Sequence, residues 1–213
     1  MRILDDRAVL RARTSRYGSL ERCKSVGPIE AGKCIAEGNS RVFGEVELND
    51  YRFDRVTVAD LPMIDRWLQT PAVREWWIDA EGNPADPIGA SDLGQRDVDM
   101  WIVSWKGLPF AFMQDYDPHA CEGHHFAYLP AGSRGIDQFI GDAAMLDRGH
   151  GSSFIKARIA TLFASGVPAV GTDPHPRNAR AIRAYEKSGF VAKEICSTAW
   201  GMCLLMEVQA GRS

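Results

Sequence analysis

The order in which strand-like and helix-like patterns follow one another constrains the fold of this chain more than any other feature. The first clear alternation, Tyr51–Val56, is typical of a half-buried strand. A hairpin follows, with strands over Met100–Trp105 and Leu108–Tyr116 joined by a turn at Lys106-Gly107. Because a hairpin run comes first and a single strand–helix–strand crossover comes late, the sequence predicts an α/β fold. The expected sheet is mixed and mostly antiparallel, flanked by helices, and not doubly wound.

Helical spacing, Gly and Pro positions and strand alternation predict the remaining elements. A helix begins after Asp60, which we expect to be its N-cap, with Pro62 in the first turn. A later helix is capped by Asn178 and ends at Gly189. The expected helices cover 61–68, 72–77, 152–164 and 178–188; the further strands cover 135–141, 167–172, 190–198 and 200–208; and a long loop covers 79–94.

Composition indicates an ordinary globular protein of one main domain. The chain has 213 residues, with 45% hydrophobic and 25% charged side chains. The longest apolar run, Ala199–Met206, is far shorter than the ~20 residues that a membrane span needs. The first residues are charged and carry no apolar signal segment, so we expect a cytoplasmic protein without a membrane partner. Residues 1–45 lack any sustained period, and we interpret them as an N-terminal extension that can be disordered, followed by one domain over 46–213.

Charge and cysteine content narrow the class of partner. Residues 1–45 carry a net charge of +3 and the rest of the chain a net charge of −6. An acidic body disfavours nucleic acid and suits a cationic ligand, although acidity can also serve solubility alone. Five cysteines without a C-x-x-C pair argue against a zinc ribbon or a disulfide framework.

A glycine-containing turn between a strand and a helix is the first motif with a chemical meaning. The segment Arg148-Gly149-His150-Gly151-Ser152 follows the expected strand over 135–141 and opens the helix over 152–164. Backbone N–H groups at a helix start, together with the helix dipole and the charge of Arg148, can hold a pyrophosphate without a metal. The segment is neither a Walker A loop nor G-x-G-x-x-G, and glycine at such a turn can also serve geometry alone.

The second motif is a helix that starts at Asn178 and carries Tyr185 two turns later. Tyr185 lies three residues after Ile182, so it can be a core aromatic residue as well as a functional one. The string N-x-x-A-I-x-x-Y-E-K-x-G-F, over 178–190, resembles the GCN5-related N-acetyltransferase (GNAT) superfamily. Further strings resemble its aminoglycoside 6′-N-acetyltransferase branch: Arg134-Gly135-Ile136-Asp137-Gln138, Thr172-Asp173-Pro174 and Glu75-Trp76-Trp77.

This resemblance covers about residues 50–208 and implies a GNAT fold, whose sheet is splayed in the middle so that acetyl-CoA lies in the gap. It implies acetyl transfer to an amine, with Asp137 as the base and Tyr185 as the general acid, although a mid-strand Asp137 can also be a structural ion-pair partner. The implied acetyl-CoA site is Ile136, Gln138, Phe139, Ile140, Arg148, Gly149, His150, Gly151, Ser152, Asn178 and Ala181, with no metal. Because His150 lies in the expected loop between strand and helix, its position also predicts a side chain that faces solvent.

The resemblance also implies a substrate-binding set: Trp77, Gln114, Glu122, Asp137 and Asp173. The acids Asp115 and Asp117 are expected on the same side. Trp76 and Trp77 cannot both lie in the core if they share a short helix, because neighbours point about 100° apart. His124-His125 replace two Trp of the relatives, and Trp200 replaces an acid of their C-terminal hairpin.

The expected substrate is a small polycationic amine, an aminoglycoside, acetylated at its 6′-amine by a monomer or weak dimer. A siderophore, polyamine or peptide amine is an alternative acceptor, and a non-catalytic acyl-CoA-binding module is an alternative function. One cluster, His119, Cys121, Glu122, His124 and His125, offers metal-ligand side chains without a recognised spacing, so we expect at most an adventitious metal there.

Overall fold

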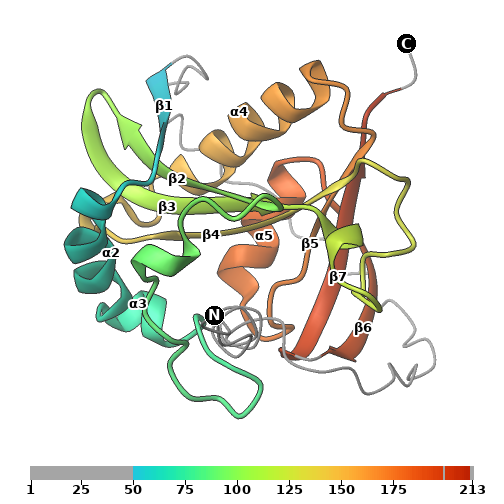
Figure 1. The fold of residues 1–213 in the computed structure, drawn as a ribbon, viewed down its shortest axis with the longest axis horizontal. Coiled ribbons are helices and arrows are strands. Elements are labelled where there is room, and N and C mark those ends of the chain that lie inside the picture. Colours follow the sequence, from blue (N-terminus) through green and yellow to red (C-terminus); the bar gives the residue numbers. More distant parts are fainter. Residues whose placement is uncertain (1–49, 199, 212–213) are drawn as a thin grey trace, which may run out of the picture.

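The computed structural model describes residues 50–198 and 200–211, which form a seven-stranded sheet of order β1-β2-β3-β4-β5-β7-β6. The strands are β1 (Tyr51–Arg55), β2 (Val98–Trp105), β3 (Leu108–Tyr116), β4 (Arg134–Ile140), β5 (Ala169–Thr172), β6 (Val191–Thr198) and β7 (Gly201–Gln209). The helices are α2 (Leu61–Leu68), α3 (Pro71–Arg74), α4 (His150–Ala164) and α5 (Ala179–Lys187). In Figure 1 the β6–β7 hairpin stands at the opposite end of the sheet from β1.

The expected order of elements is confirmed, with shifts at some ends. The second helix ends at Arg74, earlier than expected, and α4 begins two residues early, at His150. Asn178 caps α5 as expected, since its side chain accepts from the backbone N–H of Ala181. Asp60 is the N-cap residue of α2, as expected, but its side chain forms no hydrogen bond with the helix. Its carboxylate instead accepts from the backbone N–H and hydroxyl of Thr57 and so closes the short turn that precedes α2.

Each face of the sheet is covered by a different pair of helices. On one face α4 and α5 pack on side chains such as Val103 and Ile136. On the other face α2 and α3 pack with Trp77 on Phe112 and Phe139. Side chains alternate between the faces of a strand, so neighbouring residues of β4 point into different halves of the molecule.

The splay expected from the resemblance is present between β4 and β5. These strands are parallel and pair only at Arg134–Val170 and Gly135–Gly171. A Cβ on Gly135 would lie 2.2 Å from the ring of Tyr116, so this position admits only glycine at the last point where the strands are paired. Beyond it, the backbone of β4 has β3 on one side and no strand on the other.

Asp115 is a structural residue, contrary to the expectation that it lies on the substrate side. It is 1% exposed and forms ion pairs with Arg134 and Arg158, at 2.9 and 2.6 Å. The indole N–H of Trp101 also donates to it, at 2.8 Å. A buried carboxylate is stable only with such partners, so this network ties β3 and β4 to α4 and leaves no oxygen for a ligand.

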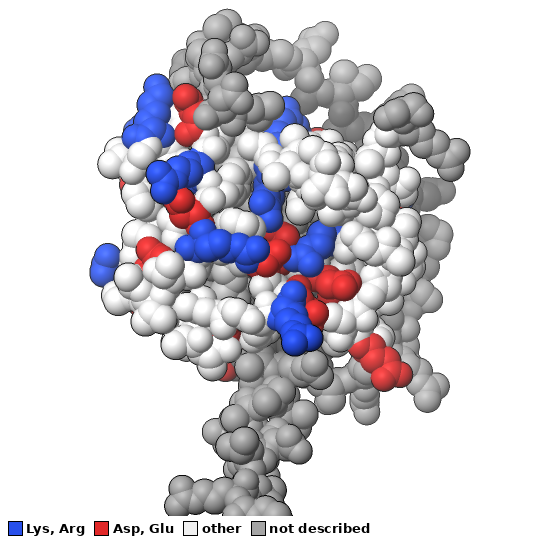
Figure 2. Space-filling view, turned by 45° about the horizontal axis from the view of Figure 1, so that its top comes forward, with Lys and Arg blue, Asp and Glu red and all other residues white. Residues whose placement is uncertain are grey.

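Charges of both signs are interspersed on the face that Figure 2 shows, without an extended patch of either sign. Within 50–198 and 200–211 no helix is long and apolar enough to cross a membrane. The expected extension over 1–45 and the start of the expected domain, 46–49, lie outside the described residues.

Candidate active site

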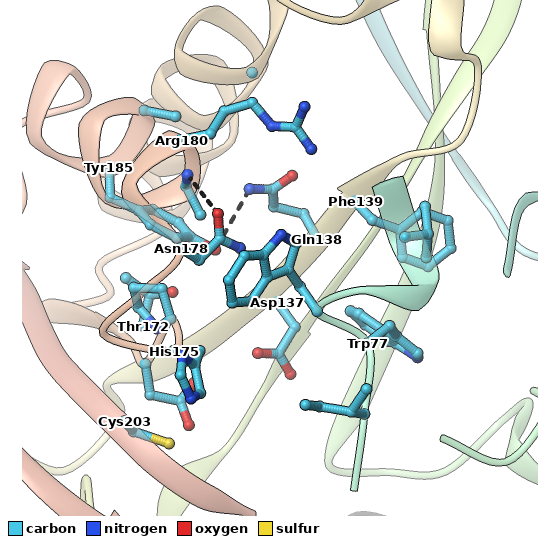
Figure 3. A pocket seen from close by; sticks show the side chains of 18 of the residues that line it. Trp77, Asp137, Gln138, Phe139, Thr172, His175, Asn178, Arg180, Tyr185 and Cys203 are labelled. Atoms are coloured by element: carbon cyan, nitrogen blue, oxygen red, sulfur yellow. Dashed lines mark hydrogen bonds between the residues drawn. The ribbon is translucent and has the colours of Figure 1, made fainter. Parts of the chain in front are cut away.

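A cavity of about 610 Å³ opens where β4 and β5 diverge. Its walls come from the free edge of β4, the first turn of α4, the inner face of α5, the segment 172–175 after β5, and the segment 76–82 after α3. Figure 3 shows side chains from these elements converging on one space. The cavity therefore joins a helix start, which attracts anions, to a region that holds carboxylates.

Asp137 lies in this cavity on the α2–α3 face of β4, and its carboxylate accepts a hydrogen bond from the neighbouring strand. The side-chain amide of Gln114, on the neighbouring strand β3, donates to its Oδ2 at 2.8 Å. An amide N–H can only donate, so this bond favours the ionised carboxylate. Gln114 itself is 5% exposed and does not line the cavity. The structure thus places Gln114 behind Asp137, where it orients the carboxylate.

Tyr185 reaches the same cavity from α5, on the opposite face of the sheet. Its ring is 4% exposed and packs on Phe190, and its hydroxyl oxygen accepts from the side chain of Gln138 at 3.4 Å (Figure 3). Burial raises the pKa of the Tyr185 phenol well above its ordinary value, and the charge of Asp137 adds to the rise. Tyr185 therefore stays protonated at neutral pH and has a proton to give. It belongs to the hydrophobic core and also lines the cavity.

The first turn of α4 presents backbone to the cavity. Gly149, its N-cap, has φ +85°, and a Cβ added there would meet nothing within 4 Å. Gly149, Gly151 and Ser152 line the cavity. This is the part of the motif at which an anion can approach backbone N–H groups closely.

His150 and Arg148, from the same motif, do not line the cavity. The expectation of a solvent-facing His150 is wrong, because its side chain is 4% exposed. Its Nδ1 lies 2.8 Å from the hydroxyl of Tyr51, and its ring packs on Trp105 and Phe110. Burial lowers the pKa of His150, so it is a neutral core residue. Arg148 is exposed and is not among the residues that line the cavity.

The cations near this end of the cavity come from α5. Arg180, Arg183 and Lys187 all line the cavity, and their spacing of three and four residues places them on one helical face. None of the three forms an ion pair with another of the described residues. The start of α4 lies beside α5, because the hydroxyl of Ser188 donates to the carbonyl of Ser152 at 3.1 Å. The two helices thus form one anion-attracting end.

The other end of the cavity is aromatic and acidic. Trp77 lines it but is 8% exposed and belongs to the core, with its ring 4.9 Å from that of Phe139. Its neighbour Trp76 is half-buried, lines the cavity and packs on His175, with ring centroids 5.5 Å apart. Both Trp follow the end of α3 at Arg74, and Trp77 belongs to the core whereas Trp76 is more open to the cavity.

Asp173 lines the same end, and the Nε2 atom of His125 lies 3.2 Å from its Oδ2. Glu122 is exposed and does not line the cavity. Three further residues of this end are His124, Trp200 and Cys203.

Comparisons with known proteins identify the family to which the chain belongs. An acetyltransferase (GNAT) domain matches residues 56–198. The chain belongs to the GNAT acetyltransferase family. It is 33% identical over 158 residues to an aminoglycoside N(6′)-acetyltransferase type 1 of Klebsiella pneumoniae, covering 71% of this chain and 79% of the relative. It is also 41% identical over 76 residues to a kanamycin resistance protein of Rhizobium radiobacter, covering 35% and 70%.

Solved structures of the aminoglycoside acetyltransferase AAC(6′)-Ib have the same fold. The structure in complex with ribostamycin and coenzyme A has a TM-score of 0.67 and 30% identity, and the alignment covers 75% of this chain and 93% of that one. The structure in complex with paromomycin and acetyl-CoA has a TM-score of 0.66 with the same identity and coverage. The GNAT fold expected from the sequence, with an open, mixed seven-stranded sheet, is thus confirmed.

The residues of this GNAT domain fit an acyl-CoA co-substrate. The free edge of β4 offers backbone groups for the pantetheine arm and the thioester carbonyl. The start of α4 and the cations of α5 offer positive charge for phosphates. From the expected acetyl-CoA set, the residues that line the cavity are Gln138, Phe139, Ile140, Gly149, Gly151, Ser152, Asn178 and Ala181, whereas Ile136 is fully buried beneath it.

Sequence reasoning missed several cavity residues, for reasons that differ. The cations of α5 have a helical spacing that could have been recognised in the sequence. Trp76, His175 and Trp200 line the cavity from segments far apart in the chain, and no local spacing places them there. No three His, Cys, Asp or Glu side chains within the described ranges are placed to hold a metal ion. In the cluster weighed above, His119 instead contacts the carbonyl of Leu129, at 3.1 Å.

Proposed function

We propose that this protein is an acetyl-CoA-dependent aminoglycoside 6′-N-acetyltransferase. The observation that carries the proposal is that Asp137 and Tyr185 reach one cavity from opposite faces of the sheet, between a cationic end and an acidic, aromatic end. A base and an acid so placed lie on either side of the point where an acceptor amine meets a thioester. The relatives named above, whose names and complexes include aminoglycosides and coenzyme A, support the same substrate pair.

Asp137 supplies the base in this proposal. An alkyl amine with a pKa near 10 is neutral in only about one molecule in a few thousand at pH 7, so the acceptor needs a group that takes its proton. The Oδ2 atom of Asp137 is held by Gln114, and the carboxylate lines the cavity in which the acceptor ammonium group would lie. Once deprotonated, the amine nitrogen attacks the thioester carbonyl and a C–N bond forms.

Tyr185 supplies the proton for the leaving group. As the C–S bond breaks, the phenol O–H of Tyr185 donates to the sulfur, and Gln138 holds the phenol oxygen in place. Backbone N–H groups along the Ile136–Ile140 strand polarise the thioester carbonyl. The acceptor ammonium group loses two protons in total. Asp137 takes the first and releases it to solvent, and the second leaves the nitrogen after the C–N bond has formed and replaces the proton that Tyr185 gave to the thiol. The protons and bonds therefore balance without a metal.

The proposed acceptor site is the aromatic, acidic end of the cavity. There Asp173 offers a carboxylate to a second amino group, and Trp76 and His175 offer flat faces to a sugar ring. Glu122 stays a proposed substrate contact only if the acceptor extends beyond the cavity lining. We further propose that the enzyme is cytoplasmic and acts as a monomer or weak dimer.

The test is release of free thiol from acetyl-CoA by the purified protein with a panel of acceptors. We expect rapid release with ribostamycin and kanamycin and slow release with linear polyamines and peptides. Mass spectrometry and NMR of the product locate the acetyl group, which we expect on the 6′-amine. A preference for hydroxylamines or peptides would assign another acceptor class. Acetyl-CoA binding without transfer to any amine would identify a non-catalytic module.

A further inference from the structure

His125 is the residue of the acceptor end whose placement calls for an explanation. Its Nε2 atom lies 3.2 Å from Oδ2 of Asp173, and the two side chains are 6% and 13% exposed. The N–H direction of His125 is not aligned with the carboxylate, so the contact is an electrostatic pair and not a regular hydrogen bond. Both side chains line the cavity. One oxygen of the proposed acceptor-binding carboxylate is therefore already beside a protein cation when His125 is protonated.

Three aromatic rings hold His125 in this position. His124 stacks on it with ring centroids 4.2 Å apart, Phe126 lies at 4.4 Å, and Trp200 meets it edge-on at 5.2 Å. Burial lowers the pKa of His124 to about 3, so that ring stays neutral. The backbone N–H of Phe126 donates to Nδ1 of His124 at 3.0 Å, which fixes the stack. His125 is thus a pre-positioned side chain that needs no rearrangement to face Asp173.

Asp173 is fixed from its own side as well. It follows β5 directly and precedes Pro174, whose carbonyl accepts from the backbone N–H of Leu204 at 2.8 Å. The thiol of Cys203 also faces it, and burial together with the charge of Asp173 raises the pKa of that thiol, which stays uncharged. Of these two neighbours, His125 is the one whose side-chain nitrogen lies within ion-pair distance of Asp173.

We propose that His125 is a specificity-determining residue, which competes with acceptor amino groups for the carboxylate of Asp173. Together with His124 and Trp200 it forms an aromatic wall that suits a sugar ring better than several ammonium groups. Each additional amino group of the acceptor then adds less binding free energy than it would add if Asp173 were not paired with His125. This inference rests on the proposed function, since it concerns the acceptor of that reaction.

The experiment compares two acceptors in a double-mutant cycle. Ribostamycin carries several amino groups, and 6-amino-6-deoxyglucose carries one. We measure kcat and KM for both with the wild type, His125→Phe, Asp173→Asn and the double variant. Phenylalanine keeps the stacked ring but removes both nitrogens. The quantity to compare is kcat/KM for ribostamycin divided by kcat/KM for the monoamine. We expect His125→Phe to raise this ratio by about 5-fold, through a lower KM for ribostamycin. In the Asp173→Asn background the same change should leave this ratio unaltered.

Two further variants keep the result interpretable. His125→Gln replaces the imidazole with a smaller, polar side chain, and it should reproduce the change in ratio if the phenylalanine variant folds poorly. His119→Phe removes another His–Asp contact, to Asp117 at 3.6 Å, that lies outside the cavity lining. It should leave the ratio unchanged.

Specific outcomes overturn the inference. A higher KM for ribostamycin in His125→Phe would mean that His125 binds the acceptor itself. An equal effect with and without Asp173 would mean that His125 acts through cavity shape. In either case a wild type that acetylates ribostamycin still upholds the proposed function. A wild type that neither acetylates nor, by calorimetry, binds either amine would overturn both.

Discussion

At Asp137, the side-chain amide of Gln114 donates a hydrogen bond to the carboxylate that lines the cavity. Asp137→Asn keeps the shape of the side chain and removes the base. We expect kcat/KM to fall by about 10²- to 10⁴-fold, the usual contribution of a general base, with little change in acetyl-CoA affinity. Steady-state kinetics and calorimetry measure the two quantities. A variant with near-wild-type kcat/KM would contradict the proposed role.

The neighbouring variant Gln114→Leu separates orientation from chemistry. It leaves the base in place but removes the donor to Oδ2, so we expect a smaller loss than in Asp137→Asn. The pH at which the base titrates should move upward, because the bond that favours the ionised form is gone. An unchanged pH profile of kcat/KM would show that Gln114 does not act through Asp137.

Tyr185→Phe tests the proposed acid. The change removes one hydroxyl and keeps the ring that packs on Phe190. We expect a fall in kcat that is smaller than in Asp137→Asn, because water can also protonate a thiolate, and little change in the thermal midpoint Tm. Unaltered turnover would mean that this tyrosine serves the core alone. The raised pKa of the phenol also predicts that wild-type kcat does not fall between pH 8 and 9.5 through loss of the Tyr185 proton.

At the scale of the element, α5 combines three tasks on different faces. Asn178 starts the helix, Tyr185 fills the core, and the face of Arg180, Arg183 and Lys187 lines the cavity. Helical geometry allows this division because residues three and four apart share a face while intervening residues do not. The cationic face, together with the start of α4, takes over the electrostatic role that the G-x-G motif suggested for Arg148.

A pair of arginine variants tests this assignment. Arg183→Gln removes a cation that lines the cavity. Arg148→Gln removes an exposed cation that does not line the cavity. A charge close to a phosphate is screened by solvent less than an exposed one. We therefore expect Arg183→Gln to weaken acetyl-CoA binding several-fold and Arg148→Gln to leave it almost unchanged. Calorimetry with chelator present measures both. A larger loss of acetyl-CoA affinity in Arg148→Gln than in Arg183→Gln would show that Arg148 binds the phosphates.

At the scale of the whole molecule, two buried histidines link stability to pH. Burial lowers the pKa of His124 from 6.5 to about 3 and also lowers that of His150. In the unfolded chain these side chains take up protons near pH 6.5, whereas the folded chain keeps them neutral. Folding stability is therefore fully present above about pH 6.5 and is lost as pH falls toward 3.

This loss of stability can be measured at pH values above those at which carboxylates titrate. Between pH 7.5 and pH 5 we expect His124 to account for a loss of about 1–2 kcal/mol, which lowers Tm by roughly 3–6 °C. His124→Gln should show a smaller loss over the same range, whereas His119→Gln, whose side chain is 33% exposed, should behave as the wild type. Equal slopes for all three proteins would contradict the link. Thermal scans in matched ionic strength provide the data.

The division of the chain into an extension and a domain makes a further prediction at this scale. The family match begins at residue 56, and the described fold begins at Asp50. A chain that begins at Gly44 should keep both the fold and acetyl transfer, because we interpret residues 1–45 as separate from the domain. Circular dichroism and the thiol-release assay check this. Loss of folded protein on truncation would show that the extension packs on the domain.

The sequence by itself determined the elements and their order. Alternation over Tyr51–Val56, the Lys106-Gly107 turn and the Asn178 cap are local signals, since each depends on spacing within a few residues. The pattern over 178–190 also identified the family, and with it Asp137 and Tyr185. Both side chains lie in the cavity, because their positions follow from strand alternation and helical period.

Only the tertiary structure decided which of the remaining side chains face the cavity. His150 and Gly149 are neighbours, yet one is buried against Trp105 and the other is open to the cavity. Asp115 and Asp137 are both strand acids, but only Asp115 meets two arginines from other elements. His125 and Asp173 are 48 positions apart in the chain and meet across the acceptor end. Such pairings depend on how the layers pack, and burial and charge there are properties of the assembled fold that no local spacing encodes.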